Sequence, residues 1–345
     1  MPELTDFTVP DFHLPFGNAK HPHAARANAE ATAWAVEHEL VTDAVDQFAG
    51  IGFGHLAGRV SGDVPYETVV LLAKWMAWSF VLDDQHDHLI RNGRLAAWQP
   101  LVGAIAEYLG TGRINRAPAR GNPLVRGFTE LCDRILAGLS EPAAHRFRSH
   151  FRLVLRSLDQ EAGNRRAGGR PTVEDHLLLR RHSSQLLPMM DMVEAGLGID
   201  LPQHIHDLPA FREVVASTLD IIGWENDVFS LPKEHSCGDT NNLVSLIACR
   251  DRCSLADALR TVEGLIHARI EGYLECERRL FRVLDAGEGT EPALREAVSR
   301  CVRSYEDWMI GADLWQRYEC TRYSDERFAA GLESAYTRPD LVSVA

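Results

Sequence analysis

Residues 65–88 read PYETVVLLAKWMAWSFVLDDQHDH. Pro65 suits the start of a helix, where its missing N–H is not needed. The segment then stays apolar on almost every helical face until Asp83. A helix of that kind is expected in the centre of a bundle rather than on its surface. The apolar run ends at the acidic group 83–87, where we expect the buried helix to meet solvent. This stretch therefore favours a helical bundle with carboxylates at one end of its central helix.

Helical periodicity continues along nearly the whole chain. Besides 65–88, we expect helices over residues 24–48, 95–109, 124–138, 141–162, 173–197, 209–231, 254–284 and 291–319. Ser254 and Asp257 have the spacing of a capping box at the start of one of them. A loop is expected over 162–171 and a turn over 236–240. We find no convincing alternating strand, no internal repeat and no linker, so the sequence predicts a single all-α domain.

The expected domain spans residues 24–335. Residues 1–23 are rich in Pro, Phe and His and are interpreted as an extended arm that lies on the body of the domain. Residues 336–345 are expected to form a C-terminal tail.

The composition favours a soluble globular protein over a nucleic-acid-binding or membrane protein. With 45% hydrophobic and 25% charged residues, the 345-residue chain resembles a soluble globular protein that can bury a sizeable core. Its net charge of −13 argues against a nucleic-acid partner, which would require a basic face. No apolar run reaches 18 residues and the N-terminus lacks a signal peptide, so we expect no stable membrane insertion. The seven cysteines form no CxxC pair, as expected for reduced thiols in a cytoplasmic protein.

The first candidate site is the acidic group that ends the central helix. Asp83 and Asp87 are four residues apart and share a helix face, with Asp84 one step round the helix. Such close carboxylates repel each other unless a cation lies between them. Mg²⁺ takes one or two protein carboxylates together with waters and phosphate oxygens, which matches this pattern. A solvated helix end without a role is the alternative.

The second candidate site follows the apolar segment LDIIGWEN of residues 219–226. Asn226, Ser230 and Glu234 recur every four residues and present an amide oxygen, a hydroxyl and a carboxylate along one stripe. An all-oxygen set of this kind suits a hard cation. Pro232 lies inside the stripe and is expected to bend the helix or to end it early. The alternative is polar decoration near a helix end.

With these two motifs the chain resembles the bacterial class I terpene synthases. That family has an Asp-rich motif after a buried helix and a second metal motif of the form N-D-x-x-S-x-x-x-E, and both occur here without substitution. The resemblance extends to the approach FVLDD with Phe80, to Asn242-Leu243-Val244, and to Arg322-Tyr323 seven residues after Trp315. It covers nearly the whole chain, up to about residue 325. It implies an all-α class I terpenoid synthase bundle with a central active-site cavity.

The resemblance also implies roles for individual residues. Three Mg²⁺ ions are expected. Asn226, Ser230 and Glu234 would hold one of them and Asp83 would bridge the other two, while Asp84 and Asp87 would more often support the site through hydrogen bonds or salt bridges. The candidate metal-binding set is Asp83, Asp84, Asp87, Asn226, Ser230 and Glu234. The candidate substrate-binding set is Phe80, Arg180, Arg181, Lys233, Trp315, Arg322 and Tyr323.

The family also has an arginine that senses the diphosphate, about 45 residues before the second motif. Arg180 and Arg181 lie 46 and 45 residues before Asn226, so spacing does not choose between them. We favour Arg181, because its neighbours match the order R-x-x-S, and count it with Arg322 and Tyr323 as catalytic. A glycine usually follows the sensor by four residues, but Ser184 or Gln185 stands at that position here. This departure leaves open how a helix break there would trigger ionisation.

The function implied is Mg²⁺-dependent ionisation and cyclisation of an acyclic isoprenyl diphosphate, most often farnesyl diphosphate. Phe80, Trp224 and Trp315 are candidate aromatic faces for stabilising the carbocation. A cyclase acting on geranylgeranyl diphosphate is an alternative. A chain-elongating isoprenyl diphosphate synthase would require a second Asp-rich motif, which is missing here, and a non-catalytic helical binding protein would not require both metal motifs. The sequence leaves homodimerisation open.

Overall fold

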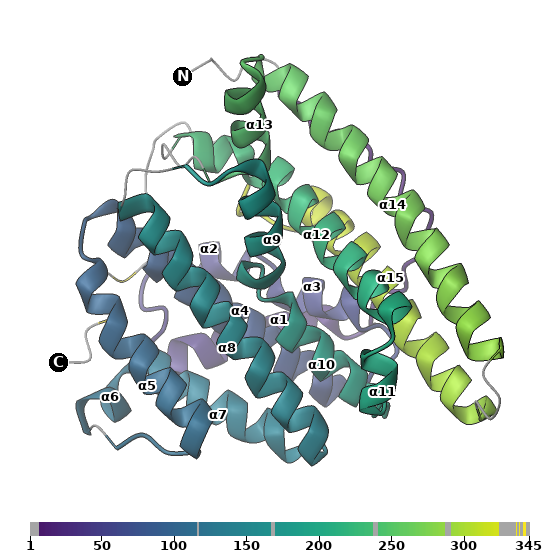
Figure 1. Ribbon diagram of the computed structural model, residues 1–345. Coiled ribbons are helices and arrows are strands. Elements are labelled where there is room, and N and C mark those ends of the chain that lie inside the picture. The colour runs from purple at the N-terminus through teal and green to yellow at the C-terminus, as the bar shows by residue number, and fades with distance from the viewer. Residues whose placement is uncertain are drawn as a thin grey trace.

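The computed structural model describes residues 7–115, 117–166, 170–236, 241–286 and 291–323, together with Tyr336, Arg338, Leu341 and Val342. Within these residues every regular element is a helix, which confirms the all-α prediction (Figure 1). The helices are α1 Ala24–Glu37, α2 Val45–Ala49, α3 Phe53–Val60, α4 Tyr66–Arg91, the 3-10 turn η1 Leu95–Ala97, α5 Trp98–Thr111, α6 Ala117–Gly121, α7 Pro123–Ala137, α8 Glu141–Arg166, α9 Val173–Ser183, α10 Leu186–Gly196, α11 Gln203–His206, α12 Pro209–Ser236, α13 Leu243–Asp251, α14 Leu255–Ala286 and α15 Pro292–Tyr318.

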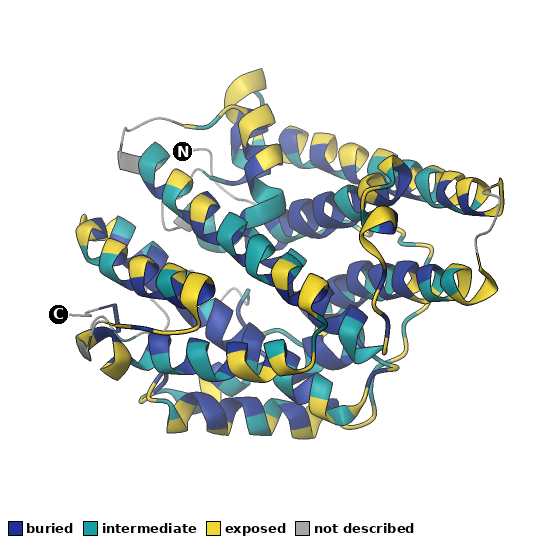
Figure 2. Cartoon of the chain, turned by 60° about the horizontal axis from the view of Figure 1, so that its bottom comes forward, coloured by how far each residue is buried: buried dark blue, intermediate teal, exposed yellow. Residues whose placement is uncertain are grey.

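Helix α4 is the central helix that residues 65–88 predicted. It is contacted by α1, α3, α7, α8 and α10, and its side chains are buried on nearly every face. Trp75 and Trp78 of α4 pack against Phe128 of α7 and against Phe147 and Phe151 of α8, with ring centroids 5.1–6.0 Å apart. Figure 2 shows the same pattern across the fold, with buried residues on the inward faces of the helices and exposed residues on the outer ones. The middle of α4 is thus packed in a large aromatic core.

Helix α3, which the periodicity did not predict, packs unusually close to α1. A Cβ atom added at Gly54 would lie 2.0 Å from the backbone nitrogen of Asn28, and one at Gly58 would lie 2.6 Å from the Cβ of Ala24. The two glycines are four residues apart on one face, so they let the two helix backbones touch. The short helices α6, α11 and α13 were also missed.

The helix predicted over 24–48 is interrupted, because α1 ends at Glu37 and α2 begins at Val45. Glu39 takes a left-handed conformation with φ 59°. The amide of Glu39 donates to the carbonyl of Val36 and the amide of Leu40 donates to that of Ala35. This is a Schellman ending, for which glycine is the usual residue. Because Glu occupies that position, the sequence held no ordinary stop signal.

The helix predicted over 173–197 is two helices, α9 and α10. Gln185 separates them with a left-handed φ of 61°. Pro188 lies in the first turn of α10, where its missing N–H is tolerated, whereas in a continuous helix it would leave the carbonyl of Ser184 without a partner. Pro188 was the signal that could have located the break.

Helix α12 extends five residues beyond the predicted end at residue 231. Pro232 lies inside it, so this proline does not end the helix. Residues 237–240 of the predicted turn, residues 167–169 of the predicted loop, and the expected domain boundary at residue 335 lie outside the described residues, as does most of the C-terminal tail. None of the described helices combines the length and apolarity that crossing a bilayer requires.

The aromatic core under α4 gives a stability test. Replacing the fully buried Phe151 by Ala should lower the free energy of unfolding by about 3–5 kcal/mol, because it removes a large ring and leaves a cavity. Replacing Tyr318 by Ala, whose side chain is 74% exposed, should change it by about 0.5 kcal/mol or less. Guanidinium denaturation followed by circular dichroism measures both values. Equal losses in the two variants would contradict this description of the core.

Candidate active site

Both acidic motifs line a single pocket. Helix α4 contributes Phe80, Asp83 and Asp87, and α12 contributes the stripe of Asn226, Ser230 and Glu234. The break between α9 and α10 and the end of α15 supply the remaining walls. The further lining residues discussed below are Arg180, Lys233, Trp308, Trp315, Gln316, Arg322 and Tyr323. Segments that are about 140 residues apart in the sequence are thus brought to one site.

Asn226 is held in place by neighbours on three elements. Its side-chain amide donates to Oε1 of Gln316 at 2.7 Å and to the hydroxyl of Tyr323 at 3.0 Å. Its Oδ1 accepts a hydrogen bond from Arg180 at 2.6 Å. The two hydrogen bonds donated by its nitrogen therefore fix the orientation of the Asn226 amide, and its oxygen points toward the guanidinium of Arg180.

Ser230 and Glu234, the other two residues of the stripe, differ in their hydrogen bonds. The hydroxyl of Ser230 is buried and has no hydrogen-bond partner among the residues that the structure describes. Oε2 of Glu234 accepts a hydrogen bond from Nδ2 of Asn242 at 2.8 Å, and the same nitrogen donates to the carbonyl of Asp227 at 2.6 Å. Asn242 is fully buried and also caps α13. It therefore fixes Glu234 relative to the backbone of α12, a positioning role that the sequence analysis did not assign.

Asp227 anchors the other side of the motif. Its Oδ2 accepts from the amide of Leu243 at 3.0 Å and lies 2.7 Å from Nε2 of His176, and its Oδ1 lies 2.9 Å from Nε of Arg180. Burial would raise the pKa of Asp227, but Arg180 and His176 outweigh it and lower the pKa. Asp227 borders the pocket but is only 1% exposed, and both of its oxygens are engaged by these contacts, so it orients the motif.

The aspartates of α4 separate into two environments. Asp83 faces the pocket, and its side chain is 43% exposed to that space. Burial inside the molecule and the neighbouring carboxylate of Asp87 raise the pKa of Asp83 to about 7. Asp84 points away from the pocket, and its oxygens accept hydrogen bonds from Arg322 at 2.6 and 2.9 Å and from Tyr336 at 2.9 Å. Burial opposes ionisation of Asp84, but Arg322 and Lys233 hold its pKa at about 2.

These environments fit a divalent cation. Asp83, whose pKa is raised by burial and by Asp87, lies on one wall, and the buried hydroxyl of Ser230 lies on another wall, without a hydrogen-bond partner among the described residues. Carboxylate, amide and hydroxyl oxygens are the ligands that Mg²⁺ prefers. Asp84 is a poor direct ligand, because its oxygens are already engaged, so its inclusion in the metal-binding set is not supported. Within the described residues, no three His, Cys, Asp or Glu side chains form a metal cluster by themselves.

The structure places Arg180 in the pocket, and not Arg181, which the sequence analysis favoured as the sensor. Arg180 lines the pocket and contacts Asn226, whereas Arg181 turns to the opposite side and forms a bidentate pair with Asp220 at 2.6 and 2.8 Å. Successive helical residues point about 100° apart, so one position decides which arginine enters the site. The order R-x-x-S could not decide, because Ser183 also stands three residues after Arg180.

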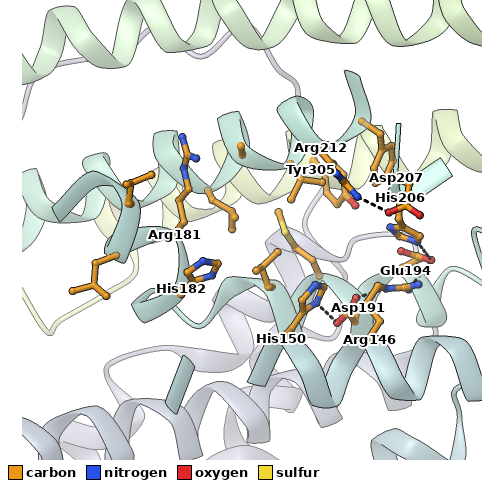
Figure 3. Close-up of a pocket in the computed structure, with 18 of the residues that line it drawn as sticks. Arg146, His150, Arg181, His182, Asp191, Glu194, His206, Asp207, Arg212 and Tyr305 are labelled. Atoms are coloured by element: carbon orange, nitrogen blue, oxygen red, sulfur yellow. Dashed lines mark hydrogen bonds and ion pairs between the residues drawn. The ribbon is translucent and has the colours of Figure 1, made fainter. Parts of the chain in front are cut away.

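Arg181 instead borders a separate cavity of about 680 Å³ between α8, α9, α10 and α12 (Figure 3). Charged side chains that line this cavity form ion pairs with one another. Arg146 pairs with Asp191 at 2.8 Å and with Glu194 at 3.0 Å, and Arg212 pairs with Asp207 at 2.6 Å. None of the metal-motif residues borders it. Among the described residues, the arginines that border this cavity are thus each paired with a carboxylate.

Arg322, Tyr323 and Lys233 complete the side of the pocket that carries cationic and hydrogen-bond-donating groups. Arg322 lies 5.1 Å above the ring of Phe80 and 3.9 Å from Asp83, in addition to its bond with Asp84. Nζ of Lys233 lies 3.8 Å from Oδ1 of Asp84. The structure therefore brings Arg322, Tyr323 and Lys233 to the pocket that holds the two motifs.

The apolar wall is partly as predicted. Phe80 and Trp315 line the pocket, as does Trp308, which the sequence analysis missed. Trp315 is fixed by a hydrogen bond of 2.9 Å from its Nε1 to the carbonyl of Ile51. Trp224 is buried but does not line the pocket, so its candidacy was wrong.

Comparison with known proteins agrees with this site. Residues 74–272 match the family model described as "Terpene synthase family 2, C-terminal metal binding". Pristinol synthase from Streptomyces pristinaespiralis is 30% identical over 332 residues, which cover 94% of this chain and 87% of that protein. The (+)-T-muurolol synthase from Roseiflexus castenholzii, named as cyclizing (2E,6E)-farnesyl diphosphate, is 28% identical, with 92% and 95% covered.

A solved structure has the same architecture. Germacradien-4-ol synthase from Streptomyces citricolor superposes with a TM-score of 0.77 at 25% identity, over 90% of this chain and 98% of that one. The matched family region contains the acidic end of α4, Arg180, and the whole stripe on α12. The family match covers more than half of the chain and the pocket carries the family's motifs, so this protein belongs to terpene synthase family 2 and is a class I terpene synthase.

Proposed function

We propose that the protein ionises and cyclises farnesyl diphosphate, yielding a cyclic terpene and diphosphate. The observation that carries this proposal is that both metal motifs, Arg180, Arg322 and Tyr323 line a single pocket with aromatic residues beside them. The choice of a C15 substrate is supported by relatives named for farnesyl diphosphate cyclisation, such as the T-muurolol synthase.

The polar half of the pocket would bind the diphosphate. Asn226, Ser230 and Glu234 would hold one Mg²⁺ and Asp83 would contact the other two expected ions, with Asp87 supporting them. Bound Mg²⁺ would supply the positive charge that stabilises diphosphate as a leaving group.

The protein's own donors would contribute to the same stabilisation. The guanidinium groups of Arg180 and Arg322 can each donate two parallel hydrogen bonds to phosphate oxygens, and Lys233 and the hydroxyl of Tyr323 add further donors. These groups are already oriented by Asp227, Asp84 and Asn226, so little reorganisation is needed as charge develops on the leaving group.

The apolar half of the pocket would fold the isoprenyl chain. When the C–O bond breaks, its electron pair leaves with the diphosphate and an allylic cation remains, without any protein nucleophile. Phe80, Trp308 and Trp315 present aromatic rings that can stabilise such a cation, and the apolar wall excludes water.

The substrate assignment is tested by product analysis. Purified protein should convert farnesyl diphosphate to a cyclic hydrocarbon or alcohol, detected by gas chromatography–mass spectrometry, and EDTA should abolish the product. Geranyl and geranylgeranyl diphosphate serve as length controls. A cyclic product from the C20 substrate alone would replace this proposal with a diterpene cyclase. Longer prenyl diphosphates formed only with isopentenyl diphosphate would contradict cyclisation.

The sensor assignment is tested by a matched pair of variants. Arg180→Gln should lower kcat by roughly 100-fold or more, because it removes a donor aimed at the developing charge. Arg181→Gln removes the same charge one position away, where Asp220 is its partner, and should retain kcat within about tenfold. Single-turnover product formation and thermal unfolding should be measured for both. A larger loss in Arg181→Gln, with the fold intact, would reverse the assignment.

A further inference from the structure

The N-terminal arm crosses the side of α12 that faces away from the pocket. In Figure 1 its purple trace passes behind α14. The described part of the arm, residues 7–23, contacts α14 through His13, which stacks on His267 with ring centroids 5.8 Å apart, and through Phe16, whose ring lies 5.7 Å from that of Tyr273. The arm therefore occupies a position between helices rather than the mouth of the pocket.

Phe12 connects the arm to α12, the helix that carries the second metal motif, through a contact between aromatic rings. Its side chain is 1% exposed and meets the ring of Phe229 edge to face at 6.3 Å. Phe229 directly precedes Ser230 on α12. It does not line the pocket, so it lies on a different face of the helix from the metal-binding stripe of Asn226, Ser230 and Glu234. The guanidinium of Arg317 on α15 lies 5.3 Å from the ring of Phe12 and 5.2 Å from that of Phe229. Arg317 also donates to the carbonyl of Pro10 at 2.5 Å.

A second set of contacts connects the arm to the end of α15. Lys20 pairs with Glu319 at 2.6 Å, and Arg59 holds the same carboxylate with bonds of 2.8 and 2.9 Å. Asn18 donates to the carbonyl of Arg59 at 2.9 Å. Glu319 stands three residues before Arg322. The arm thus touches two of the chain segments that carry ligand-binding groups, namely α12 and the end of α15 that leads to Arg322.

The metal stripe depends on such outside support. Pro232 has no N–H, so the carbonyl of Val228 lacks its usual partner in the helix, and the turn that carries Ser230 and Glu234 is held by fewer backbone bonds. Asn242 holds Glu234 by a hydrogen bond. Phe12 and Arg317 enclose Phe229, which does not line the pocket.

We propose that Phe12 is a positioning residue of the metal site, which acts through Phe229 to keep Ser230 and Glu234 at binding distance from the Mg²⁺ ion that they would hold together with Asn226. The inference rests on the proposed metal-dependent function. It adds that the N-terminal arm, which is remote from the chemistry, sets the affinity of the pocket for Mg²⁺ and diphosphate. Supporting residues around metal ligands typically change metal affinity by roughly 10- to 100-fold when they are removed.

The test compares Phe12→Ala with two controls. Phe16→Ala truncates the same arm but contacts α14, and Phe151→Ala removes an equally buried ring from the core under α4. Thermal unfolding is measured while Mg²⁺ is titrated with inorganic diphosphate at a fixed concentration, because ligands that bind the folded state raise the unfolding midpoint. The Mg²⁺ concentration for half-maximal activity with farnesyl diphosphate is measured in parallel. Phe12→Leu retains apolar bulk and guards against misfolding of the alanine variant.

Phe12→Ala should raise the half-saturating Mg²⁺ concentration about tenfold in both assays, with partial recovery in Phe12→Leu. The two controls should keep the wild-type Mg²⁺ dependence, whatever their unfolding midpoints. An unchanged Mg²⁺ dependence in both Phe12 variants, or the same shift in all variants, would reduce the arm to a structural role. No stabilisation of the wild-type protein by Mg²⁺ and diphosphate would overturn the metal site itself, and with it this inference.

Discussion

Carboxylates that meet inside an apolar bundle repel one another unless positive charge lies between them, and this constraint organises the protein. The chain supplies part of that charge itself, since Arg322 binds Asp84 and Arg180 binds Asp227. Asp83 is left with a pKa near 7 beside Asp87, facing the pocket. Both carboxylates line the pocket, where a metal–diphosphate complex would bring cations.

The same constraint explains why one acidic motif contains residues with different tasks. The carboxylate oxygens of Asp84 and Asp227 bind arginines and other buried donors. These contacts fix the orientation of the arginine side chains. Asp83 and the stripe on α12 face the open side. The oriented arginines and the ligands are therefore parts of one network, and truncating a supporting carboxylate would disturb donors as well as the helix that carries it.

Much of this arrangement could be predicted from the sequence, and the remainder has physical causes. The apolar faces of residues 65–82 predicted a central helix because burial on all sides leaves no polar stripe. The spacing of Asn226, Ser230 and Glu234 predicted a shared face because helical geometry is regular. The choice between Arg180 and Arg181 failed, because one residue turns a side chain by about 100° and only the packed neighbours decide which way it points.

Backbone irregularities were the second source of error. Glu39 and Gln185 adopt left-handed conformations that glycine usually takes, so neither carried a local signal, although Pro188 did mark the second break. The contact between Phe12 and Phe229 joins positions more than 200 residues apart and has no periodic signature.

The most direct test of the account is a crystal structure grown with Mn²⁺ and inorganic diphosphate, with anomalous scattering used to locate the metal. The account predicts one peak bound by Asn226, Ser230 and Glu234 and further peaks at Asp83, with Arg180, Arg322 and Tyr323 on the diphosphate. Metal bound elsewhere, with these side chains unchanged and the stripe on α12 empty, would contradict it.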